Sequence, residues 1–110
     1  MSRYGLRFVA LGYLAALLAA PVSLVAWRAR IARGELLGPR LVVAGPQLDA
    51  MAWPDSSSVH QRWRTVVRDS AEGAAAVAGL HAAGVDYIKV HHLGPAAYAG
   101  AAAESRRRGL

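Results

Sequence analysis

The hydrophobic and polar positions divide the chain into an apolar start and a tail of short alternating elements. Residues 8–27 carry no charge, and arginines flank them on both sides. This length matches the roughly 20 residues that cross a bilayer core, so the pattern predicts an apolar N-terminal helix. Three interpretations stay open: a leader or membrane anchor, a buried helix of a larger fold, or sequence from outside the original reading frame of the gene.

After residue 27 the pattern changes to short apolar runs separated by helical segments. In chain order it predicts a short helix at 28–33, a strand at 41–44, a loop at 47–58, an extended segment at 63–67, a helix at 70–83, a strand at 85–90 and a helix at 95–108. This alternation is typical of a parallel sheet with right-handed crossovers. We therefore expect an N-terminal helix at 1–27 and an α/β region at 28–110.

Residue signals fix the ends of the two longer helices. Asp69 stands three residues before Glu72, a spacing that predicts a capping box with Asp in place of Ser or Thr. Gly84 suits the position just after a helix, where the backbone turns left-handed. Pro95 suits the first turn of the last helix, where its missing N–H costs nothing.

Length and cysteine content exclude several classes of protein. A chain of 110 residues predicts one small domain and is too short to complete an eight-stranded α/β barrel of roughly 250 residues. The chain has no cysteine, which excludes a disulfide scaffold, a zinc ribbon and a thiol nucleophile.

The net charge of +6 comes from arginine, with a single lysine. Such a charge suits nucleic acid only where it gathers on one face. The arginine clusters at 62–68 and 106–108 lack the interleaved aromatic side chains of a base-stacking surface, apart from Trp63. We therefore expect no nucleic-acid partner.

The single lysine, Lys89, lies near the C-terminal end of the strand predicted at 85–90. Ligands and catalytic groups gather at these strand ends in parallel α/β folds, and an ammonium among apolar residues is costly to bury unless its charge is paired or lost. The amine could capture carbon dioxide and bind metal ions as a carbamate, or it could reach solvent along the strand. The period of two places His91 on the same side.

Residues 82–90 have the sequence Ala-Ala-Gly-Val-Asp-Tyr-Ile-Lys-Val, and a helix, a Gly-Pro break and a Val-Ala-Gly-Pro run precede them at 30–46. In this order and separation the two blocks resemble the central part of the amidohydrolase superfamily, most closely the imidazolonepropionase-like metal-dependent hydrolases. The resemblance covers about residues 24–110. It implies a partial TIM-type (β/α) barrel with two or three parallel strands, preceded by the apolar N-terminal helix.

The resemblance also implies a chemistry and its limits. In that family the lysine of the G-[AV]-D-[FY]-I-K pattern is a carbamate that bridges divalent ions, commonly zinc, which implies Lys89 as the metal ligand. Metal-activated water then hydrolyses amide, cyclic amide or other C–N bonds. The family's remaining ligands would lie upstream, where residues 8–27 hold no histidine, and beyond Leu110. The resemblance therefore implies a hydrolase fragment that is inactive and metal-free alone.

The other candidate residues are weaker. His91 is expected to touch substrate or metal in a completed barrel; otherwise His91 and His92 are polar residues at a strand end. His60 and His81 receive no role, and we interpret Asp49 and Asp86 as solvated or capping residues.

Two functions follow from these observations. The first is the hydrolase fragment, whose partner is a small amide-type substrate. The alternative is a small non-enzymatic protein with a barrel-derived tail, exported or membrane-associated through residues 8–27. If that apolar segment is not genuine, the chain is expected in the cytoplasm.

Overall fold

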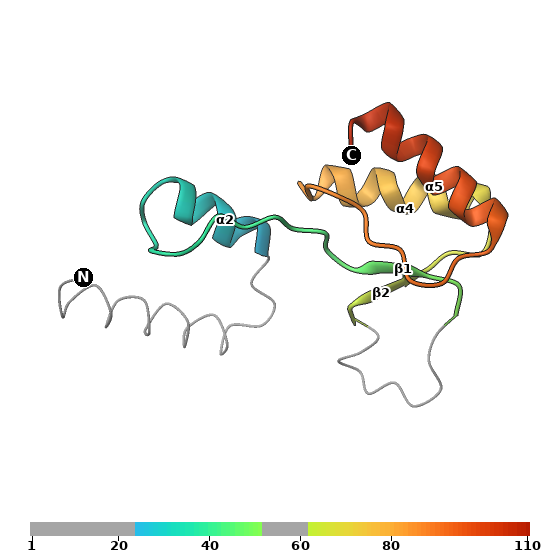
Figure 1. Ribbon diagram of the computed structural model, residues 1–110, viewed down its shortest axis with the longest axis horizontal. Coiled ribbons are helices and arrows are strands. Elements are labelled where there is room, and N and C mark those ends of the chain that lie inside the picture. The colour runs from blue at the N-terminus through green and yellow to red at the C-terminus, as the bar shows by residue number, and fades with distance from the viewer. Residues whose placement is uncertain (1–23, 52–61) are drawn as a thin grey trace. The chain divides into compact units, whose positions relative to one another are not determined.

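The computed structural model describes residues 24–51 and 62–110 (Figure 1). The elements are α2 (Leu24–Ala32), β1 (Gln47–Asp49), β2 (Arg64–Val66), α4 (Ser70–Ala82) and α5 (Pro95–Arg108). The chain divides into two compact units, Met1–Val42 and Val43–Leu110, and each is described by itself.

In the first unit, α2 ends at Ala32, and Gly34 shortly after it adopts a left-handed conformation with φ of 73°. The Gly34 and Glu35 N–H groups donate to the carbonyls of Ile31 and Arg30, so the end of the helix predicted at 28–33 is confirmed to within one residue. The helix begins at Leu24 rather than at residue 28. Most of the apolar helix predicted at 8–27 lies outside the described residues. Within residues 24–51 and 62–110, no helix has the length and apolar character needed to cross a membrane.

In the second unit, β1 is the central strand. It pairs in parallel with β2, with Leu48 opposite Thr65. On its other edge the Leu48 N–H donates to the Lys89 carbonyl at 2.8 Å, and the His91 N–H donates to the Leu48 carbonyl at 3.0 Å. Leu48 and Val90 thus form an isolated parallel bridge. The parallel arrangement is confirmed, with β1 between β2 and residues 89–91.

The barrel-fragment prediction is wrong. In a (β/α) barrel each strand lies beside the next one in sequence. Here the segment after α4, residues 89–91, bonds to β1 and not to β2, the strand that precedes it in sequence. The only sheet among the described residues has two strands of three residues each. The segment predicted as a strand at 85–90 contributes a single bridge, which is too little to continue a barrel wall.

The prediction of a strand at 41–44 is also wrong. Val43 and Ala44 are buried, which explains their apolar character. The backbone of Val43 bonds to Asp86, however, and not to a neighbouring strand. Its N–H donates to the Asp86 carboxylate at 2.8 Å, and its carbonyl accepts from the Asp86 N–H at 2.7 Å. The strand lies a few residues later, at β1, inside the segment predicted as a loop.

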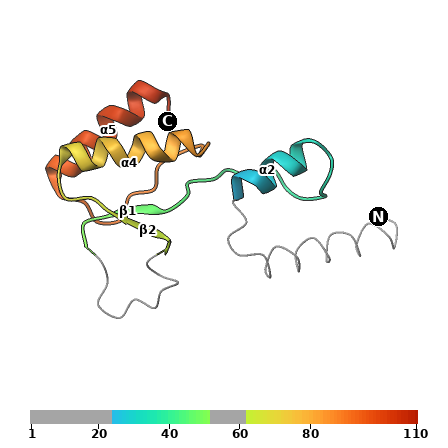
Figure 2. The same cartoon turned by 180° about the vertical axis from the view of Figure 1, so that it is seen from behind.

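Helices α4 and α5 lie together on one side of the sheet in both views (Figures 1 and 2). Their small residues allow close backbone contact: a Cβ atom on Gly100 would lie 2.1 Å from the Ser70 carbonyl oxygen, and one on Gly73 would lie 2.5 Å from that of Ala97. The core between these helices and the sheet contains Leu48, Val67, Val77, Ala97 and Ala101. This layer holds β1 in place from one side.

The predicted helix ends are confirmed. The Asp69 carboxylate accepts the Glu72 N–H at 2.8 Å, although the Glu72 carboxylate accepts from Arg68 rather than from Asp69 itself. Gly84 has φ of 85°, and Pro95 stands in the first turn of α5. These signals act within one helical turn, which is why the sequence displays them.

A candidate metal site at the sheet edge

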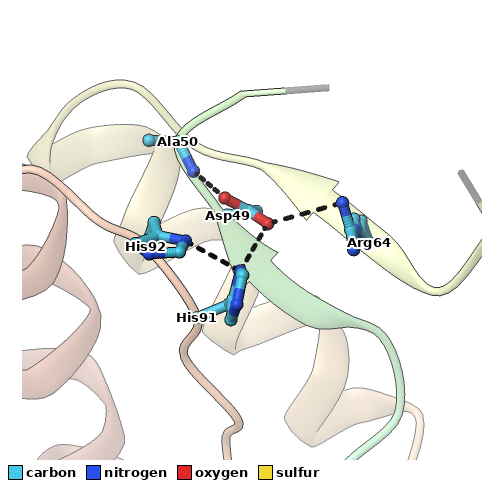
Figure 3. Close-up of polar contacts among 5 residues, drawn as sticks. All are labelled: Asp49, Ala50, Arg64, His91 and His92. Atoms are coloured by element: carbon cyan, nitrogen blue, oxygen red, sulfur yellow. Dashed lines mark hydrogen bonds and ion pairs between the residues drawn. The ribbon is translucent and has the colours of Figure 1, made fainter. Parts of the chain in front are cut away.

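Asp49 is the last residue of β1 and is completely buried. Side chains alternate along a strand, so Leu48 enters the core while Asp49 faces away from the helices. Its Oδ1 accepts the Ala50 N–H at 2.9 Å. Its Oδ2 lies 3.1 Å from Nδ1 of His91 and 3.9 Å from Nη1 of Arg64 (Figure 3).

Two consecutive histidines complete the group. The backbone bond from His91 to Leu48 brings the His91 ring to the end of β1. Nδ1 of His92 lies 2.9 Å from Nδ1 of His91, and the two rings meet edge to face with centroids 4.0 Å apart. One ligand atom from each of Asp49, His91 and His92 lies within 4.8 Å of the other two. The end of β1 and the segment after Val90 thus converge on one spot.

The contacts at Nδ1 of His91 compete for one proton. A ring nitrogen of neutral histidine is either a donor or an acceptor, and it cannot be both at once. When Nδ1 of His91 carries a proton, Oδ2 of Asp49 and Nδ1 of His92 must share that one donor. When Nδ1 of His91 carries no proton, neither it nor the carboxylate can donate, so no hydrogen bond joins His91 to Asp49. A metal ion, in contrast, can bond all three atoms together.

Two of the three separations between the ligand atoms are near those of a zinc site. Zinc binds imidazole nitrogen and carboxylate oxygen at about 2.0–2.2 Å, so tetrahedral ligand atoms stand about 3.3 Å apart. The Asp49–His91 and His91–His92 separations of 3.1 and 2.9 Å would need to open slightly, and the ligand atoms of Asp49 and His92 lie within 4.8 Å of each other. His91 and His92 are exposed at the surface, so an ion can enter from solvent.

Arg64 contributes a positive charge next to this group. It lies on β2 opposite Gln47, on the same face as Asp49 because both strands alternate in register. Its side chain is only 20% exposed, so solvent screens its charge weakly. The guanidinium balances the Asp49 carboxylate, and it would also repel an incoming cation.

The structure brings together only part of the predicted set. His91 is in the group, but its predicted contact with substrate stays a prediction. Lys89 is exposed and joins the sheet through its carbonyl oxygen; its role as a carbamate likewise stays a prediction. His81 lies on α4, with Nδ1 3.4 Å from Nη1 of Arg108, and His60 lies outside the described residues.

Sequence reasoning missed Asp49 and His92. Asp49 was expected to be a solvated or capping residue, and the first alternative is wrong because its side chain is fully buried. The available signal was the apolar Leu48 directly before it, but a three-residue strand is too short to display alternation. His92 falls on the opposite side from His91 in an ideal strand, and the irregular backbone after Val90 removes that constraint.

The chain matches no protein-family model, no curated protein and no solved structure.

Proposed function

We propose that this chain binds one divalent transition-metal ion, with zinc as the best fit, through Asp49, His91 and His92. The observation that carries the proposal is the convergence of a buried carboxylate oxygen and two imidazole nitrogens within 4.8 Å. Imidazole together with carboxylate is a donor set that suits zinc and its neighbours better than calcium or magnesium.

The position in the fold supports the same conclusion. Asp49 and His91 stand at the C-terminal ends of adjacent parallel segments, at the point where the chain reverses its progress across the sheet. In open α/β sheets ligands bind outside the carboxyl ends of the strands where the strand order reverses. The buried Asp49 is fixed by the Ala50 N–H, which limits the reorganisation that binding requires.

Three protein ligands leave a coordination position for water, which is the pattern of catalytic zinc sites. A bound water with its pKa lowered to about 7 is a nucleophile for amide carbonyls. Hydrolysis of a C–N bond, the reaction class expected from the sequence pattern around Lys89, is the activity that we propose for the loaded site. This proposal uses Asp49, His91 and His92 and requires no completed barrel.

Zinc titration by calorimetry tests the metal site. The wild-type chain should bind one equivalent, and His92→Ala should weaken binding on the order of 100-fold, because losing a ligand costs more than the 10–100-fold of losing a supporting contact. His81→Ala is the matched control, since it removes an exposed histidine of α4 that contacts Arg108 and is not part of the group. Equal weakening by both substitutions, or no binding by the wild type, contradicts the proposal.

Hydrolysis needs a separate assay. Zinc-loaded wild-type protein should release amine from a panel of linear and cyclic amides, and Asp49→Asn should abolish that release, with circular dichroism showing that the variant is folded. Zinc binding without turnover of any amide would remove the hydrolase activity and leave the metal site in place.

A further inference from the structure

We infer that the metal-loaded site binds an oxyanion, a carboxylate or phosphate group, held between the metal ion and the guanidinium of Arg64. This inference rests on the metal site proposed above and names the class of ligand that the site takes.

The Arg64 guanidinium lies close to the position of the proposed metal ion. Nη1 of Arg64 lies 3.9 Å from Oδ2 of Asp49. A metal ion bound to Oδ2 at about 2.0–2.2 Å would therefore lie at most about 6 Å from that nitrogen. Two oxygens of one carboxylate or phosphate can span such a gap, with one on the ion and the other accepting a hydrogen bond from the guanidinium.

Metal binding would give the group of charges around Asp49 and Arg64 an excess of positive charge. Before metal binding, Arg64 and Asp49 neutralise each other. A divalent ion held by this carboxylate and two neutral imidazoles leaves the group, with Arg64, carrying two positive charges. Asp49 is fully buried and Arg64 is 20% exposed, so the excess is poorly screened. An oxyanion removes much of it, which makes ion and anion binding mutually favourable.

The side chain of Arg64 is of the type that binds oxyanions. Arginine presents a planar fork of N–H donors that matches the paired oxygens of carboxylate and phosphate, whereas the point charge of lysine does not. Arg64 is placed for this role by β2, which pairs directly with the strand that carries Asp49. The exposed histidines on the other side leave the ion accessible to a ligand from solvent.

The test measures zinc affinity with and without methylphosphonate, and separately with and without acetate. In the wild type the anion should strengthen zinc binding, by about tenfold within the 5–150-fold range of typical coupling between two ligands. Arg64→Gln should bind zinc alone at least as tightly as the wild type, because a repelling charge is gone, but should lose the enhancement. Arg64→Lys should retain a smaller enhancement.

Arg68→Gln is the matched control, because Arg68 is an exposed arginine of the same segment that pairs with Glu72. It should preserve the full enhancement. The same enhancement in Arg64→Gln as in the wild type would overturn the inference while the metal site stands. No enhancement in the wild type would also overturn it. No zinc binding at all would refute the metal site itself. Comparing the two anions shows which oxyanion is preferred.

Discussion

The α4–α5 pair and the C-terminal edge of the sheet are held by different kinds of contact. The helices meet at glycine and alanine with almost no intervening side chain. Local hydrogen bonds cap both ends of α4 and the C-terminal end of α5, and Pro95 begins α5. The sheet edge consists of three-residue strands and one bridge, and polar side chains converge there. The helix pair is therefore the closely packed part of the unit, and the sheet edge is the part where polar side chains gather.

The largest effect is expected from filling the helix contact. Gly100→Ala should lower the free energy of unfolding by about 3 kcal/mol, at the upper end of overpacking costs, because the new Cβ would meet the Ser70 backbone. Gly79→Ala is the control: nothing lies within 4 Å of its Cβ position, so this change should stabilise the protein by about 0.5–1 kcal/mol. Urea denaturation measures both, and equal effects would refute the close packing.

The next effect concerns the sheet edge. Zinc at 100 times its dissociation constant should stabilise the folded chain by about 2.7 kcal/mol. The gain in amide hydrogen-exchange protection should be largest at Leu48 and His91, whose N–H groups join the strands that carry the site. Protection that increases only in α4 and α5 would show that the ion binds elsewhere.

A smaller effect tests the start of α4. Asp69→Ala should cost about 1 kcal/mol of unfolding free energy, because it removes the acceptor of the Glu72 N–H. Asp69→Asn should stay within a few tenths of the wild type, since asparagine caps equally well. Thermal melts compare the two; a loss in the asparagine variant as large as in the alanine variant would argue for charge rather than capping.

The smallest effect is a pH dependence in α5. The hydrogen bond from Arg108 lowers the pKa of the Glu104 carboxyl, burial opposes this shift, and the charge of Arg107 adds to it. A lowered folded-state pKa contributes stability that is present above the unfolded value of about 4.3 and is lost as pH falls through the folded value. Glu104→Gln should therefore melt below the wild type at pH 7, and the difference should narrow below about pH 4. A difference independent of pH would refute this assignment.

The helices of the second unit could be predicted because their signals are local. Asp69 and Glu72 lie within one turn of each other, and Gly84 and Pro95 act at their own positions. The strands could not be predicted as well. Apolar character at Val43 and Ala44 reports burial, and burial does not require a strand partner. The site was predicted only in part, through His91.

The sequence by itself determined where α4 and α5 begin and end, because the hydrogen bonds that stop a helix join residues a few positions apart. Only the tertiary structure decided that β1 is the central strand and that Asp49 is buried beside His91. These two residues are 42 positions apart, and no local propensity specifies which distant segment a short strand will join. The order of the strands, and with it the candidate metal site, comes from packing the helices over β1.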